Sequence, residues 1–136
     1  MKRWHSCLLL LVLGLLGCDP SRVELSGEVT PDGQPLKEGS LLLLPGDGNR
    51  GIATGCAIEK GTYRLASQQA PTVGPYGVEI RASKKTGRMI QKALGQSGEL
   101  VDEMVEAVAP RYNSKSTLTV DVKAGEHTAD FAVFSK

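Results

Sequence analysis

The sequence has few of the side chains from which metal centres, redox sites and catalytic triads are built. Its 136 residues include two histidines, His5 and His127, and three cysteines. A zinc site normally takes three or four Cys, His or carboxylate ligands, and a hydrolytic triad needs a base together with a residue that orients it. These counts predict no metal site, no cofactor and no catalytic residue, so we do not expect an enzyme.

The sequence also lacks an apolar run long enough to cross a membrane. A spanning helix needs roughly 20 apolar residues, whereas the apolar run over residues 8–16 has about half that length and contains Gly14. Lys2 and Arg3 precede this run, and the small residue Gly17 follows it. A basic start, a short apolar core and a small residue are typical of a secretory signal.

The end of the apolar run carries a more specific pattern. Leu15-Leu16-Gly17-Cys18 resembles the lipobox of bacterial lipoproteins, in which cleavage occurs before the cysteine and its thiol is acylated. The resemblance implies cleavage between Gly17 and Cys18, lipidation of Cys18 and a bilayer as partner, because two or three acyl chains hold a protein on a membrane. A plain signal cut nearby would leave Cys18 as a free thiol.

This processing implies a location in the cell envelope, lipid-anchored on a periplasmic or surface face. Asp19 after the cysteine resembles an inner-membrane retention signal of some bacteria, so the choice between inner and outer membrane stays open.

The chain divides into a signal peptide (1–17), a lipidated tether (18–22) and one domain (23–136). Removal of the signal takes away Lys2 and Arg3 and no acid, so 16 basic against 15 acidic residues becomes 14 against 15. A nearly neutral domain gives no electrostatic reason to expect nucleic acid as partner. With Cys18 acylated, Cys56 has no partner for a disulfide.

Most of the domain reads as short strands separated by turns. Apolar and polar residues alternate over 23–30, and Pro31-Asp32-Gly33-Gln34-Pro35 then has the composition of a tight turn. Similar patterns lie at 52–58, 63–65, 76–81, 118–123 and 129–133, whereas residues 41–44 form a short continuous apolar run that is also consistent with a strand. About seven strands without βαβ spacing predict an all-β fold, an antiparallel β-sandwich. The turn at 124–126 suggests that the last two strands form a hairpin, and Glu59-Lys60-Gly61 predicts another.

Residues 83–109 interrupt this pattern. Met89, Ile90, Ala93 and Leu94 have helical spacing, and a second apolar set over 100–108 fits a helical face better than a strand. We therefore expect a long, partly helical insertion before the last two strands.

Two stretches resemble a known family. VELSGEVTPDGQPLKEG resembles the opening of transthyretin-like and carboxypeptidase-regulatory-like domains, and PTVGPYGVEI is similar to a later strand of theirs. The tail from Pro110 is similar to small lipoproteins with one such domain. The resemblance implies a Greek-key, prealbumin-like β-sandwich and no reaction. One branch hydrolyses 5-hydroxyisourate with a histidine cluster and a C-terminal motif that this sequence lacks, so a hydrolase is the least expected function.

The expected function is a membrane-anchored, non-catalytic binding or structural module whose partners are envelope proteins or glycans. Tyr112 and Asn113 are candidate contacts for a ligand or partner, although Tyr112 could instead pack against the sandwich edge while Asn113 turns the chain. A glycan- or cell-wall-binding module is the alternative, but the domain has only Tyr63, Tyr76 and Tyr112 as polar aromatics on which a sugar could stack.

Overall fold

The structure is a computed structural model that describes residues 21–92, 98–125 and 127–135. The predicted signal peptide, Gly17, Cys18 and most of the predicted tether lie outside these residues. The described part is all-β, as the sequence predicts, with two short 3-10 helices and no α-helix. The strands are β1 (Leu25–Pro31), β2 (Glu38–Pro45), β3 (Thr54–Glu59), β4 (Thr62–Leu65), β5 (Gly74–Arg81), β6 (Ser83–Gln91), β7 (Leu100–Glu106), β8 (Thr119–Val122), β9 (His127–Thr128) and β10 (Phe131–Val133), and the 3-10 helices are η1 (Ser67–Gln69) and η2 (Pro110–Tyr112).

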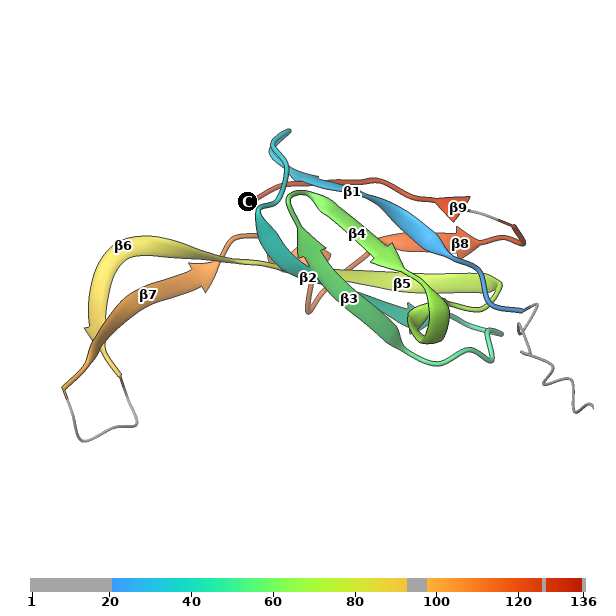
Figure 1. Cartoon of the computed structure of the whole chain (residues 1–136), viewed down its shortest axis with the longest axis horizontal. Helices are drawn as coiled ribbons and strands as arrows, with labels where there is room; N and C mark the ends of the chain where they lie inside the picture. The colour runs from blue at the N-terminus through green and yellow to red at the C-terminus, as the bar shows by residue number, and fades with distance from the viewer. Residues whose placement is uncertain (1–20, 93–97, 126, 136) are drawn as a thin grey trace, which may run out of the picture.

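Eight strands form one curled sheet, while β6 and β7 form a separate sheet that extends from it (Figure 1). The order in the large sheet is β10-β1-β4-β3-β2-β5-β8, with β9 also paired to β1. Most neighbours are antiparallel, but β9 and β10 both run parallel to β1. The sheet is therefore mixed, and the expectation of purely antiparallel pairing is wrong at this edge.

The inner face of the curled sheet encloses one hydrophobic core. Leu41 in β2 is paired with Cys56 in β3 and with Ile80 in β5, and directly opposed residues on neighbouring strands point to the same face. Burying each large apolar side chain contributes about 1.5–3 kcal/mol. The largest fully buried side chains are Tyr76, Leu25, Leu41, Leu43, Ile58, Leu65, Ile80, Val29, Val78, Val108, Val122 and Val133.

The predicted turns are confirmed where the backbone must adopt positive φ. Asp32 and Gly33 have φ of 50° and 78° after β1, and Lys60 and Gly61 have φ of 51° and 82° between β3 and β4. At Lys60 and Gly61, two consecutive positive φ values suit the right-handed twist of the β3–β4 hairpin. In contrast, the alternation over 52–58 predicts that Ile52 shares a face with Ile58, but Ile52 lies before β3 and its side chain is 67% exposed, whereas Ile58 is buried.

Over the described residues, the expected partly helical insertion is wrong, because β6 and β7 form an antiparallel hairpin instead. Ala93 and Leu94, which belong to the expected helical set, lie outside the described residues. Neighbouring apolar residues such as Met89 and Ile90 suggest a helical face by spacing, but successive residues of a strand point to opposite faces. Every residue of β6 is exposed, so no buried face imposes a period of two on its sequence. Met89 and Ile90 therefore lie on opposite faces of the hairpin, and their adjacency imitates the spacing of a helical face.

The hairpin expected between the last two strands is also wrong. β8 pairs with β5 at one edge of the curled sheet, whereas β9 and β10 pair with β1 at the other. The turn residues near Gly125 signal a change of direction but do not specify the strand with which the next segment pairs.

Candidate functional site

The predicted contact residues Tyr112 and Asn113 lie together at the end of η2, and both are buried. Tyr112 is part of the core, beneath the guanidinium of Arg111 at 5.1 Å from the ring centroid. The side-chain amide nitrogen of Asn113 donates to the backbone carbonyl of Val108 at 3.4 Å. The side-chain oxygen of Asn113 accepts from the backbone amide of Ser114 at 2.5 Å. Both side chains are used within the fold, and their role as ligand contacts stays a prediction.

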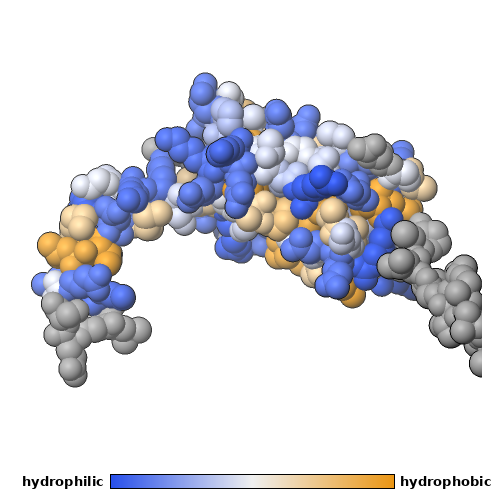
Figure 2. All heavy atoms as spheres, viewed as in Figure 1, coloured by the Kyte–Doolittle hydropathy of each residue, from blue (hydrophilic) through white to orange (hydrophobic). Residues whose placement is uncertain are grey.

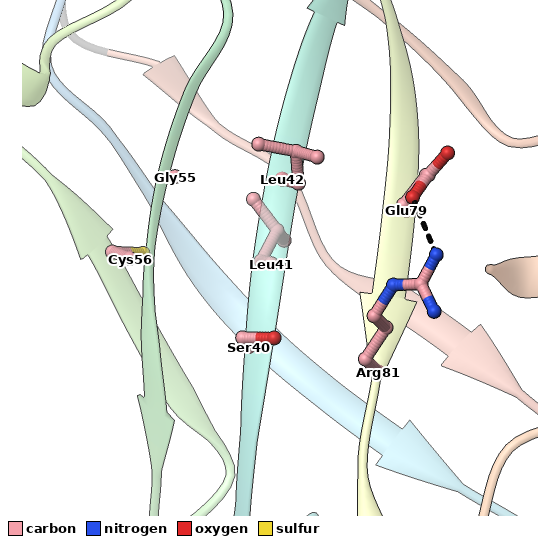
Figure 3. A pocket seen from close by; sticks show the side chains of 7 residues that line it. All are labelled: Ser40, Leu41, Leu42, Gly55, Cys56, Glu79 and Arg81. Atoms are coloured by element: carbon pink, nitrogen blue, oxygen red, sulfur yellow. Dashed lines mark hydrogen bonds and ion pairs between the residues drawn. The ribbon is translucent and has the colours of Figure 1, made fainter. Parts of the chain in front are cut away.

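A shallow depression lies on the curled sheet where β3, β2 and β5 run side by side (Figure 3). Its volume is about 390 Å³. Gly55 is paired with Leu42, which is paired in turn with Glu79, and the missing side chain of the glycine leaves space beside the leucine. The lining residues are Ser40, Leu41, Leu42, Gly55, Cys56, Glu79 and Arg81.

The charged groups of this depression neutralise each other. Arg81 donates to the carboxylate of Glu79 at 3.2 Å, with the glutamate side chain 19% exposed. The rest of the lining is mainly apolar, so the depression offers no converging set of unpaired polar groups in the described residues. It could accept a small apolar side chain, but it has no groups arranged for acid–base chemistry.

The buried titratable groups are also poorly suited to catalysis. Burial raises the pKa of the half-buried Cys56 thiol, which favours the protonated, unreactive form. Burial also raises the pKa of Tyr63, whose hydroxyl donates to the carbonyl of Ala129 at 2.6 Å. Within the described residues, no three His, Cys, Asp or Glu side chains come together as a possible metal site.

The most unusual surface of the described chain is the β6–β7 hairpin, hereafter the arm. It projects from the body, and apolar side chains gather on its outer part (Figures 1 and 2). A two-stranded ribbon of this kind gains little from burial and is marginally stable alone. The exposed large apolar side chains of the arm are Met89, Ile90, Leu100, Met104 and Val105, with 41–56% of each exposed.

The register of the arm divides these side chains between its two faces. Met104 is paired with Lys85, Asp102 with Met89, and Leu100 with Gln91, so all of these lie on one side of the ribbon. We call the set Met89, Leu100 and Met104 the methionine face. The opposite face carries the pair Ile90 and Val101, together with Val105.

Ion pairs hold the two strands of the arm together. Lys85 binds Asp102 at 2.5 Å, and Lys92 lies 3.8 Å from Glu99 at the outer end. Glu103 opposes a bulge at 86–88, where it accepts a hydrogen bond from Thr86 at 2.6 Å and pairs with Arg88 at 3.8 Å. Hydrogen bonding by Asp102, together with its charge, raises the pKa of Lys85.

The base of the arm is fixed to the body by two further hydrogen bonds. The Ala82 amide donates to the carboxylate of Glu106 at 2.9 Å, and the Ala107 amide donates to the Ala82 carbonyl at 2.7 Å.

Sequence reasoning missed the arm. The available signal was the separation of charge, because the charged residues over 84–92 are basic and those over 99–106 are acidic.

Comparison of the chain with family models, with curated proteins and with solved structures finds no match. Among the described residues, no helix has the length and apolar character needed to span a membrane.

Proposed function

We propose that this protein is a lipid-anchored envelope protein whose single domain is a non-catalytic binding module, with the arm as its contact element. The observation that carries the binding role is the exposure of the methionine face on a ribbon that projects from the body. Contiguous exposed apolar surface on a folded domain commonly marks an interaction site.

The anchoring part of the proposal rests on the sequence. The basic start, the short apolar run and Leu15-Leu16-Gly17-Cys18 together have the layout of a lipoprotein signal. The described chain then begins at Ser21, close to the proposed anchor at Cys18, and it enters the sheet at Leu25.

We also propose that the body is a Greek-key β-sandwich of the transthyretin-like type. Between β3 and β4, the structure pairs Glu59 with Thr62 alone. Strands β10, β1 and β4 on one side of this weak junction, and β3, β2, β5 and β8 on the other, can therefore form two layers around the common core. The motif resemblance over residues 23–39 and 71–80 supports the same family.

Glycan binding is less well supported. Sugar-binding surfaces commonly use exposed aromatic rings, but Tyr63, Tyr76 and Tyr112 are all buried. Among the described aromatic residues, Phe134 alone has a largely exposed side chain, at 51%.

Membrane fractionation of cells that produce the full chain tests the anchoring. The unsubstituted chain should sediment with membranes, and a Cys18→Ser chain should not be acylated and should leave the membrane fraction. Unchanged sedimentation of Cys18→Ser, or a soluble unsubstituted chain, would contradict the proposed anchor.

A photo-crosslinker placed at Met89 tests the contact role. It should label a partner in native envelopes more strongly than a crosslinker at Lys123, which lies in the turn after β8. Equal labelling from both positions would remove the arm from the proposed function.

A further inference from the structure

We propose that the outer edge of β7 accepts a third strand, supplied by an extended segment of a partner protein that combines cationic and apolar residues. This inference rests on the proposal that the arm is the contact element, and it names the chemical class of the partner.

Hydrogen bonds at both ends of the arm determine which backbone groups β7 directs outward. At the base, the Ala107 amide donates to the Ala82 carbonyl, and at the outer end the Lys92 amide donates to the Glu99 carbonyl at 3.1 Å. Along an antiparallel pair, residues direct their N–H and C=O groups alternately towards and away from the other strand. The outward groups therefore belong to Leu100, Asp102, Met104 and Glu106.

These outward groups form an open sheet edge. The sheet of the arm has two strands, so β7 has β6 as its one neighbour in the described chain. Within the described residues, no backbone hydrogen bond joins the four outward residues to the body. Such an edge is a template for a further strand, and strand addition is a recurring mode of peptide recognition.

The outer edge of β7 suits this role better than that of β6. A bulge between Lys85 and Met89 interrupts the register of β6, and Gly87 within it has a φ of 86°. Bulges and lysines are devices that protect a sheet edge from pairing. In contrast, β7 is continuous over Leu100–Glu106 and contains no glycine, proline or lysine. Figure 1 shows no further strand of the described chain beside it.

Two carboxylates on opposite faces of β7 favour a cationic segment. Asp102 lies on the methionine face, and Glu103, as the next residue of the strand, lies on the other. Asp102 binds Lys85 through Oδ2, and Glu103 uses Oε2 for both Thr86 and Arg88. In the described residues, the second oxygen of each carboxylate has no partner, so it can accept from a cation on the outer side. Like charges directly opposite are destabilising, which disfavours an acidic segment.

The remaining side chains of β7 call for apolar neighbours. Leu100 and Met104, on the methionine face, are 56% and 50% exposed, and Val105 on the other face is 41% exposed. Apolar residues directly opposite them on an added strand would cover these side chains and stabilise the sheet. Three strands are also more stable than the two-stranded ribbon.

A second copy of this chain is a poorer occupant of the edge. Its β7 would bring acidic residues beside those of the first copy, and its β6 is interrupted by the bulge. A continuous cationic and apolar segment of another protein meets neither obstacle.

A peptide designed against β7 tests the proposal. In antiparallel register, the sequence KVIKKVI places lysines opposite Glu106, Glu103 and Asp102, and apolar residues opposite the other four positions of β7. We expect the fluorescently labelled peptide to bind saturably to the full, lipidated chain in phospholipid nanodiscs. The charge-reversed peptide EVIEEVI should bind more weakly by about tenfold or more; equal binding would overturn the proposed chemistry.

Backbone methylation of the peptide separates strand addition from an electrostatic contact. The N–H groups of its third and fifth residues, opposite Met104 and Asp102, point towards β7. Methylation of both should weaken binding by about tenfold or more. The N–H groups of the second and fourth residues point away, so their methylation should change binding by less than about twofold. Equal affinities of the two methylated peptides would overturn the proposal.

Amide hydrogen exchange locates the added strand. In the free chain, the Asp102 and Met104 amides should exchange rapidly, whereas the Val101 amide, which faces β6, should be protected. The KVIKKVI peptide should slow exchange at Asp102 and Met104 several-fold. Slower exchange at Lys85 and Met89 instead, on the outer edge of β6, would overturn the proposal.

Failure of this inference is distinguishable from failure of the proposed function. If the peptide does not bind while the crosslinker at Met89 still labels a partner, the inference fails and the arm remains the contact element. If the crosslinker also shows no preferential labelling, the contact role fails with it. Dimers of the chain that the peptide dissociates would assign the edge to a second copy and overturn the inference.

Discussion

Gly27 in β1 lies against the carbonyl oxygen of Ala129, and a β-carbon added to the glycine would overlap that oxygen. The same carbonyl accepts the hydrogen bond from the Tyr63 hydroxyl. The Ala129 amide in turn donates to Ser26 at 2.9 Å, and the Asp130 carboxylate accepts from the Glu28 amide at 2.8 Å. The segment between β9 and β10 is therefore held close along β1, and the absence of a side chain at Gly27 permits it.

Gly27→Ala should destabilise the domain by about 2 kcal/mol or more, because the methyl group forces the two backbones apart. Urea denaturation measures this effect. Gly77→Ala is a matched control in β5: its added carbon would lie 3.8 Å from the Leu44 carbonyl, so its stability should change by less than about 0.5 kcal/mol. Equal stability of the two variants would show that β1 and Ala129 are not packed in this way.

Tyr63 should make stability fall at high pH. Its pKa is raised in the folded domain, mainly by burial, so folding favours the protonated phenol. This contribution is complete below the ordinary tyrosine value of about 10 and is lost as the pH rises above it. Tyr63→Phe should be less stable by about 1–2 kcal/mol at pH 7, because the Ala129 carbonyl loses its partner.

The difference in stability between the unsubstituted chain and Tyr63→Phe should narrow between pH 10 and 12. Only the unsubstituted chain must keep a phenol protonated in order to stay folded. Urea midpoints across this range provide the measurement. A difference that stays constant with pH would contradict the burial of the phenol.

Glu103→Ala should loosen the outer part of the arm while leaving the body intact. Glu103 accepts from Thr86 and pairs with Arg88 at the bulge. Hydrogen exchange at the amides of residues 89–91 should accelerate several-fold, and β2 should be unaffected. Glu99→Ala removes a more exposed pair and should have a smaller effect; equal acceleration by both changes would contradict the role of Glu103.

Cys56 should react slowly with alkylating reagents at pH 8. Its raised pKa lowers the thiolate fraction, and its half-buried position restricts access. Labelling should become rapid in urea, where the thiol is exposed and its pKa is ordinary. Rapid labelling of the folded domain would indicate an activated thiol and would reopen the question of catalysis.

The sequence predicts the body well because one face of each strand is buried. The alternation at Leu25 and Val29, or at Val78 and Ile80, follows from an inner face that excludes water. Turns that need a positive φ can also be predicted, because a glycine such as Gly33 or Gly61 stands at these positions.

The arm could not be predicted by the same reasoning. Both of its faces are exposed, so Met89 next to Ile90, and Leu100 next to Val101, carry no alternation. The pairing of β9 and β10 with β1 joins segments about 100 residues apart in the sequence, and no local residue pattern specifies such a partner. The burial of Tyr112 and Asn113 depends on how η2 packs beneath the sheet, which is likewise a tertiary effect.

Mass spectrometry of the protein purified from its native membrane tests the central claim most directly. The account predicts an amino-terminal peptide that begins at Cys18 and carries two or three fatty acyl chains. A chain that begins at another residue, or an unmodified Cys18, would contradict the proposal that this all-β domain is held on a membrane by its lipidated end.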